Sequence, residues 1–296
     1  MSRAVVIIPH FNDLSGLGVC LRALDAQTLE PARWSVIVVD NGSRDDQDPS
    51  ELVAGYAQAR LIREPKPGSY AARNRAIREA GRSDDVLVFT DSDCLPEPGW
   101  LEHGLAGLSR GSDARVLAGH VEVEAKDPKR MTPAEVYERV WAFRQDVNVR
   151  WYHYGVTANL FVPRGVLDRV GGFDEEQLSG GDRAFGNTLK QAGVGLVYGE
   201  HAVVRHPARR SLSGLLRKRR RVIGGVVRLE VQENRSGWRH DLGFFIPTPR
   251  RLLAGVRSDR LTRRRDRLVL VFVNTLMLYT TAWERVRLRL GGRPLR

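Results

Sequence analysis

Short apolar runs alternate with segments of helical period along the first 110 residues. The runs are rich in β-branched residues and end at proline or polar turn residues, as buried parallel strands do, and they cover Ala4–Ile8, Val36–Val39, Ala59–Ile62 and Val86–Thr90. Between them we predict helices carrying the stripe Leu17, Leu21 and Leu24, over Glu51–Gln58, and from a Ser69 cap to about Ala80. This order predicts an α/β fold with a parallel sheet covered by helices on both faces.

The pattern changes twice further along the chain. Glu124–Pro133 is polar and predicts a linker, after which we expect a helix over Gly180–Ala192 and strands over Val156–Val162, Val194–Val197 and Val203–Arg205. Beyond Ser211 the pattern is helical and basic. We therefore predict a catalytic domain over residues 1–210, with halves 1–115 and 116–210, and a basic helical C-terminal region over 211–296.

Charge divides the chain in the same way. From Arg205 to Arg296 there are 24 basic and 6 acidic residues, a balance of +18, whereas the first 204 residues have a balance of −6. A strongly basic segment favours an anionic partner, such as a lipid surface, a nucleic acid or a diphosphate. The alternative is a solvated surface in an arginine-rich protein, because 42 of the 47 basic residues are arginine.

The sequence also bears on location. Leu268–Trp283 is an apolar stretch of 16 residues bounded by Arg267 and Arg285, short of the roughly 20 residues that span a bilayer, so we expect an interfacial or dimer-forming helix. The alternatives are a true membrane span and a helix that packs against the catalytic body. Ala4–Ile8 is too short for a signal peptide, and the two cysteines have no metal-ligand spacing. We therefore expect a cytoplasmic protein held peripherally on the inner face of the membrane.

Polar residues follow three of the predicted strands. They are the segments Pro9–Asp13, Asp40–Ser43 and Asp91–Asp93. Any one of them is an ordinary turn, but ligands of open α/β sheets bind beyond the carboxyl ends of the strands, where all three would meet. No G-x-G-x-x-G follows the first strand, which disfavours a dinucleotide-binding domain.

Asp91-Ser92-Asp93 is the sharpest of these signals. In an extended chain alternate residues point the same way, so both carboxylates can face one ion while Ser92 points away. Two hard oxygen ligands at the end of a buried strand suit Mg²⁺ or Mn²⁺ bridging a diphosphate.

The series VVIIPHFND, VIVVDNGSRD, PGSYAARNRAI, VFTDSDCLPEPGWL, GGFDE and SGGDRAFGNTLKQAG resembles family 2 of the glycosyltransferases over roughly residues 4 to 210. The resemblance implies a GT-A fold: a Rossmann-like mixed, mostly parallel sheet flanked by helices. It also implies an inverting hexosyl transfer from a UDP- or GDP-type sugar donor to an acceptor hydroxyl. The acceptor is left open between a lipid-linked glycan, a small metabolite and a protein.

The resemblance also implies roles for individual residues. Pro9, Phe11, Asp40 and Arg73 would lie at the nucleotide, and Asp91 and Asp93 would form the DxD pair at the ribose and the metal ion. His206 would be a further metal ligand and Asp182 the catalytic base. From its place in the predicted strand on the acceptor half, we also expect Asn159 to contact the acceptor. Chemistry supports the role of Asp182, because an inverting transfer needs a carboxylate to take the hydroxyl proton. Asp182 also lies where a helix cap is expected.

Two other functions compete with this hypothesis. A nucleotidyltransferase shares the nucleotide chemistry but needs a glycine- and arginine-rich phosphate loop after the first strand, where Pro9–Asp13 has none. A nucleic-acid-binding protein using the basic C-terminal region would interleave aromatic residues with arginine, which Arg217–Arg221 does not. We therefore expect no nucleic-acid partner.

Overall fold

The computed structural model describes residues 3–81, 85–109, 115–177, 179–232 and 237–295. Its backbone contacts divide the chain into two compact units. Unit 1 comprises residues 1–122, 143–177 and 181–206, and unit 2 comprises residues 123–142, 178–180 and 207–296. Unit 2 is thus built from three separate stretches of the chain, and each unit is described by itself below.

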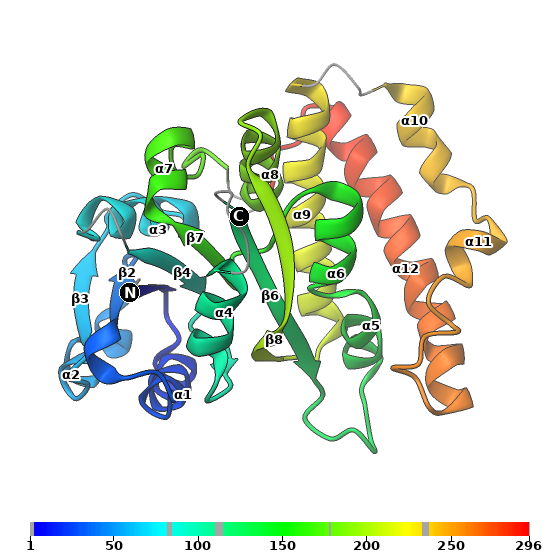
Figure 1. Cartoon of the computed structure of the whole chain (residues 1–296). Coiled ribbons are helices and arrows are strands. Elements are labelled where there is room, and N and C mark those ends of the chain that lie inside the picture. The colour runs from blue at the N-terminus through cyan, green and yellow to red at the C-terminus, as the bar shows by residue number, and fades with distance from the viewer. Residues whose placement is uncertain (1–2, 82–84, 110–114, 178, 233–236, 296) are drawn as a thin grey trace. The chain divides into compact units, whose positions relative to one another are not determined.

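Unit 1 is built on an eight-stranded sheet in the order β3-β2-β1-β4-β7-β6-β8-β5 (Figure 1). The strands are β1 Ala4–His10, β2 Trp34–Asp40, β3 Ala59–Arg63, β4 Val86–Thr90, β5 Leu95–Pro96, β6 Arg115–Glu124, β7 Asn159–Pro163 and β8 Gly195–Pro207. Neighbours among β1 to β4 pair in parallel, whereas β7 pairs antiparallel with both β4 and β6, and β5 pairs antiparallel with β8. The predicted mixed α/β fold is confirmed.

Alternate residues of the central strands enter two separate cores. Val6 and Ile8 of β1 pack with Leu17, Leu21 and Leu24 on one face of the sheet. On the other face Val5 and Ile7 pack with side chains from later helices, among them Tyr70, Ala76, Val166 and Phe185. The helices of unit 1 are α1 Leu14–Asp25, α2 Ser50–Ala54, α3 Ser69–Glu79, α4 Trp100–Ser109, α6 Gln145–Val147, α7 Arg164–Val170 and α8 Gly181–Gln191, with the short turns η1 Pro31–Arg33, η2 Asp45–Gln47 and η3 Asn148–Tyr152.

Three of the predicted elements differ in the structure. The strands expected over Val194–Val197 and Val203–Arg205 are one strand, β8. Gly199 allows this continuity, because a side chain there would lie 2.6 Å from Leu117 of the neighbouring β6. The helix expected over Glu51–Gln58 ends at Ala54, and its C-cap is Gly55, a residue of low helix propensity.

Unit 2 contains helices α5 Pro133–Trp141, α9 Leu212–Gln232, α10 Trp238–Leu242, α11 Pro249–Leu252 and α12 Arg264–Arg289, with the turn η4 Gly243–Phe245. Helix α12 packs along α9 and against α5, and Figure 1 shows α9 and α12 side by side. Val273 and Met277 of α12 join Ala134 and Leu215 in one apolar cluster, and Leu270 joins a second cluster, which contains Val136, Val140 and Leu261. The predicted basic helical region is confirmed, but it shares its core with α5.

The charges of α9 face inward more than the sequence suggested. Lys218 bonds to the buried Glu138 at 2.8 Å, and Arg220 pairs with the buried Glu284 at 2.8 Å. Arg219 bonds to Thr281 of α12. The central part of the Arg217–Arg221 run therefore serves to hold unit 2 together. No helix within the described residues is long and apolar enough to cross a membrane.

Candidate active site

The loops that follow β1 and β2 are bonded to each other. The backbone N–H of Asn12 donates to Ser43 Oγ at 3.0 Å, and the N–H of Arg44 donates to Asn12 Oδ1 at 2.9 Å. Asn12 has φ 53°, a left-handed conformation that asparagine tolerates better than most residues. Phe11, between these contacts, is 61% exposed, so its ring is open to a ligand at this edge of the sheet.

Asp40 is almost completely buried at the end of β2. Its carboxylate accepts from the N–H of Ser43 at 3.2 Å and from Arg63 Nη1 at 3.0 Å. These bonds fix the orientation of the carboxylate. Pro9, in the neighbouring strand β1, is partly buried.

Arg73 and Asp91 connect helix α3 with the end of β4. Arg73 is buried, and its Nη2 lies 2.5 Å from Asp91 Oδ1. Its guanidinium carbon also lies 5.6 Å from the centre of the Tyr70 ring. A charge-assisted bond of this length fixes the Asp91 carboxylate at the sheet edge.

Asp93 lies against His206, and the resemblance implies that both are metal ligands. His206 Nε2 lies 3.3 Å from Asp93 Oδ2, and the Phe143 ring packs 4.5 Å from the imidazole. Together with Cys94 they form a group whose ligand atoms lie within 4.8 Å of one another. The buried Cys94 thiol donates to the carbonyl of Ala158, which leaves a carboxylate oxygen and an imidazole nitrogen as the donor pair.

Asp182 lies in the first turn of α8 and is held by two hydroxyl groups. Thr157 Oγ1 donates to Asp182 Oδ1 at 3.0 Å, and Tyr70 Oη lies 3.3 Å from the same oxygen. The backbone N–H of Asp182 also donates to Tyr70 Oη at 3.2 Å. Gly181 allows this approach, since a Cβ there would lie 2.6 Å from the Tyr70 ring.

The surroundings of Asp182 change its proton affinity. Burial raises the pKa of Asp182 above its ordinary value, and the charge of Asp91 raises it further. The positive charge of Arg73 and the hydrogen bond from Thr157 act in the opposite direction without cancelling the rise. Asp182, Arg73 and Asp91 therefore share one electrostatic environment, and a carboxylate with a raised pKa is a better proton acceptor.

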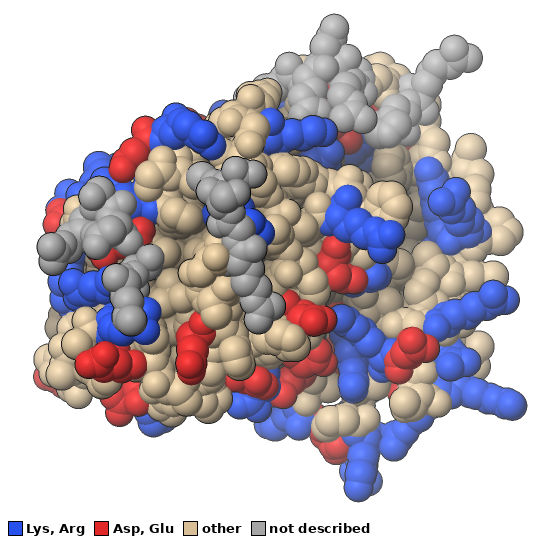
Figure 2. All heavy atoms as spheres, viewed as in Figure 1, with Lys and Arg blue, Asp and Glu red and all other residues tan. Residues whose placement is uncertain are grey.

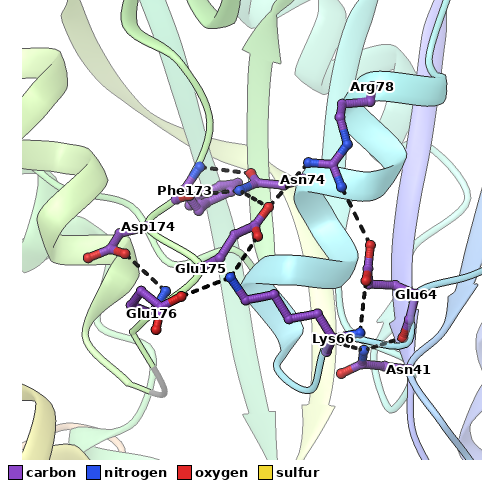
Figure 3. Close-up of polar contacts among 9 residues, drawn as sticks. All are labelled: Asn41, Glu64, Lys66, Asn74, Arg78, Phe173, Asp174, Glu175 and Glu176. Carbon is purple, nitrogen blue, oxygen red and sulfur yellow. Dashed lines mark hydrogen bonds and ion pairs between the residues drawn. The ribbon is translucent and has the colours of Figure 1, made fainter.

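A polar cluster fixes the chain that leads to Asp182 (Figure 3). Asn74 of α3 bonds to both the N–H and the carbonyl of Phe173, at 2.9 and 2.7 Å. Lys66 extends between Glu175 and Glu176, at 3.1 and 2.8 Å. The GGFDE motif is thus tied to α3 and to the loop after β3.

Asn159 differs from the expectation that it contacts the acceptor. Its side chain is completely buried, its Oδ1 accepts from the Trp100 indole at 2.9 Å, and its Nδ2 donates to the carbonyls of His120 and Ala202 at 2.8 Å each. These bonds tie β7 to β6 and β8. Asn159 is therefore a structural residue and not, as expected, an acceptor contact.

Tyr70 and Thr157 were missed at the sequence level. Tyr70 lies three residues before Arg73 on α3, so the same helix face carries both, and that spacing was a usable signal. Thr157 precedes β7 with no local pattern that distinguishes it. Its role becomes visible only where the chain brings it beside Asp182.

Comparisons with known proteins identify the family of this chain. The model of the family "Glycosyl transferase family 2" matches residues 5–171. The chain belongs to glycosyltransferase family 2. Glycosyltransferase AglE of Haloferax volcanii is 34% identical over 229 residues, covering 76% of this chain and 73% of that protein. The family membership makes the protein a glycosyltransferase, which decides between the two enzyme classes left open by the sequence.

Other similar proteins are less alike in sequence. The pre-mycofactocin glycosyltransferase of Mycobacterium tuberculosis is 28% identical over 232 residues, which are 77% of this chain and 47% of that protein. A mannosyltransferase from Pyrobaculum calidifontis, solved with GDP-Man and Mn²⁺, has a TM-score of 0.57 at 19% identity, over 98% of this family 2 chain and 76% of the other. GalNAc-T7, solved with UDP, GalNAc and Mn²⁺, has a TM-score of 0.54 at 15% identity, over 71% and 44% of the two chains. These structures support the GT-A fold.

Proposed function

We propose that this glycosyltransferase transfers a sugar, with inversion, from a nucleotide-diphosphate donor to an acceptor hydroxyl, with Asp182 as the general base. The observation that carries the proposal is the grouping of the Asp93–His206 pair, the Arg73–Asp91 pair and a partly buried Asp182 at the sheet edge. A site for a charged diphosphate and a proton acceptor of raised pKa are the two parts that such a transfer needs.

On the donor side we propose that Asp93 and His206 hold Mg²⁺ or Mn²⁺. A carboxylate oxygen and an imidazole nitrogen are suitable donors for Mn²⁺. The two atoms belong to a group whose ligand atoms lie close enough together to hold one divalent ion. When bound, the ion supplies positive charge to the departing nucleotide diphosphate. Asp91 and Asp40 would orient the ribose and the base, with Phe11, Pro9 and Arg73 beside the nucleotide.

On the acceptor side the acceptor oxygen attacks the anomeric carbon while the bond from that carbon to the diphosphate oxygen breaks. The hydroxyl proton passes to the carboxylate of Asp182, which Thr157 and Tyr70 hold in place. The bonding pair of the broken bond leaves with the nucleotide diphosphate. A UDP- or GDP-type sugar is the proposed donor, since the two solved neighbours named above contain GDP-Man and UDP.

Slow hydrolysis of the donor in the absence of acceptor tests the proposal. We expect one member of a panel of UDP- and GDP-sugars to be hydrolysed in buffer with Mn²⁺ or Mg²⁺, and chelation to stop the reaction. Asp93→Ala should weaken donor binding in metal-containing buffer but not in chelator. Equal donor affinity with and without the chelator would remove the metal ion from the proposed mechanism.

Attachment to the inner face of an anionic membrane, with a lipid-linked glycan as one candidate acceptor, stays a prediction. The basic run Arg217–Arg221 was one reason for this prediction. It now counts for less, because Lys218, Arg219 and Arg220 are bonded inside unit 2. The exposed apolar face of α12 and the arginines beside it give this prediction another basis.

A further inference from the structure

Helix α12 has an apolar stripe on the side opposite the one that packs on α5 and α9. Leu268, Phe272 and Trp283 are 74%, 59% and 66% exposed, and Tyr279 and Leu290 continue the same face. The spacings of four and seven residues keep these side chains within one side of the helix. At about 1.5 Å per residue the stripe is about 33 Å long. Single exposed apolar residues are ordinary, but an aligned series with three aromatic rings indicates a contact surface.

The segment before α12 extends this surface. The Phe245 ring packs edge-on against Trp283, with ring centres 5.8 Å apart, and the nearby Ile246 is exposed. A cavity of about 520 Å³ opens here, lined by Gly243, Ile246, Thr248, Arg250, Arg251 and Ala254. The Arg251 guanidinium is held by the carbonyl of Gly243 at 2.7 Å, and Arg250 is exposed. The cavity thus combines an apolar wall with two cations.

The exposed charge of residues 237–295 is mostly positive. Of the acidic residues described between 237 and 295, Asp241, Asp266 and Glu284 are buried, whereas Asp259 is exposed. Asp241 and Glu284 are paired with arginines of α12. The exposed basic residues of the same segment are Arg250, Arg251, Arg257, Arg263, Arg264, Arg265, Arg267 and Arg293. On the side of this segment visible at the right of Figure 2, blue side chains prevail over red.

We propose that this face of unit 2 docks the protein on an anionic lipid surface, with the α12 stripe in the headgroup region and the arginines on lipid phosphates. An apolar stripe bordered by arginine is the composition of helices that lie in the membrane interface. The cavity beside Phe245 would receive one lipid phosphate between Arg250 and Arg251. A second copy of the chain is a poorer occupant, because a two-fold interface would place the same arginines against one another.

Sedimentation with vesicles tests this surface on the full-length chain. We expect binding to vesicles of phosphatidylcholine with phosphatidylglycerol at low salt, weaker binding at raised salt, and no binding to phosphatidylcholine alone. The variant Arg264→Gln/Arg265→Gln should bind roughly 30-fold more weakly, from a contribution of about 1 kcal/mol for each basic residue. Raised salt weakens the contribution of the arginines and leaves that of the apolar stripe. Phe272→Ser/Trp283→Ser lacks two side chains of the stripe, so it should lose vesicle binding at a lower salt concentration than the wild type.

The matched control is Arg22→Gln/Arg169→Gln, which removes two exposed arginines from unit 1. It has the same net charge as Arg264→Gln/Arg265→Gln and should bind like the wild type. Equal weakening by both variants would show a net-charge effect and overturn the docking face. Vesicle binding by Phe272→Ser/Trp283→Ser that equals wild-type binding would also overturn it. The same holds if the wild type is a dimer that does not bind vesicles and this variant is a monomer, because the stripe would then be a dimer interface. Donor hydrolysis is measured separately, so failure here leaves the transferase proposal intact.

Discussion

At the scale of single residues, the environment of the proposed base Asp182 is set by two hydroxyl groups, those of Thr157 and Tyr70. Two hydrogen bonds are made to Oδ1 of Asp182, so in the proposed mechanism Oδ2 would take the proton. Tyr70 also accepts from the backbone N–H of Asp182, so the aromatic ring fixes both the main chain and the side chain. Burial raises the pKa of Tyr70 far above its ordinary value, so this hydroxyl stays protonated and can donate.

Asp182→Asn tests the proposed base directly. The amide has the same shape and can keep the bond from Thr157, so the fold and donor binding should persist. Without a proton acceptor we expect the transfer rate to fall by roughly 10² to 10⁴. Turnover is measured with the donor identified by hydrolysis, and donor affinity is measured in parallel. Near-normal turnover would leave Asp182 as a residue of the first helical turn and nothing more.

Thr157→Val tests how the base is tuned. The substitution removes the hydrogen bond that lowers the pKa of Asp182. The pKa of Asp182 should therefore rise further above its ordinary value. Since the base works only when deprotonated, activity is lost as the pH falls through this pKa, and the acid limb of kcat/KM should move to higher pH. Thr157→Ser keeps the hydroxyl and should restore the wild-type limb. An unmoved limb in Thr157→Val would contradict the tuning role.

At the scale of elements, the sequence predicts the parallel part of the sheet well and the antiparallel part poorly. Val36–Val39 and Val86–Thr90 are buried on both sides, so their unbroken apolar runs identify them. The strand β6 and the helices α4, α5 and α7 were not predicted. Helix α5 has a capping box, with Thr132 bonded to the N–H of Glu135, but it directly follows the polar stretch that suggested a linker.

The candidate site follows the same division. Asp40, Asp91 and Asp93 can be found from the sequence, because strand ends in a parallel sheet meet at one edge. Asn159 could not be placed, since an asparagine before an apolar run has the same pattern whether it faces a ligand or bonds three other groups internally. The inward pairing of Lys218 with Glu138 was equally hidden, because the two residues are 80 positions apart.

That pairing explains how α5 and α9 tolerate buried charge. Burial alone would raise the pKa of Glu138, but Lys218 and Arg209 outweigh it and hold the pKa below its ordinary value. The carboxylate is thus ionised and bonded on both sides, at 2.8 and 3.0 Å. Removing one partner would leave the other charge buried and unpaired, which lowers the free energy of unfolding by more than the pair contributes to it. The stability of α5 therefore depends on α9.

At the scale of the whole molecule, the predicted boundary at residue 210 passes through a compact unit. Unit 2 takes residues 123–142 from the middle of the chain and combines them with residues 207–296. All residues of the proposed active site lie in unit 1, within residues 1–210. That these residues form the catalytic domain stays a prediction. For folding, however, α5 and the C-terminal helices form one apolar core.

A chain ending at Arg210 tests this dependence. Ala134, Val136 and Val140 of α5 are 0%, 0% and 2% exposed, and their partners Leu215, Leu270 and Val273 would be lost. Each valine contributes roughly 1.5–3 kcal/mol when buried, so the shortened chain should unfold at a lower temperature and bind a dye specific for apolar surface. A chain ending at Gly291 keeps all of these partners and should behave like the full chain. If the chain ending at Arg210 were monomeric, bound no dye and had an unchanged Tm, α5 would not depend on the C-terminal helices, and residues 1–210 would fold independently.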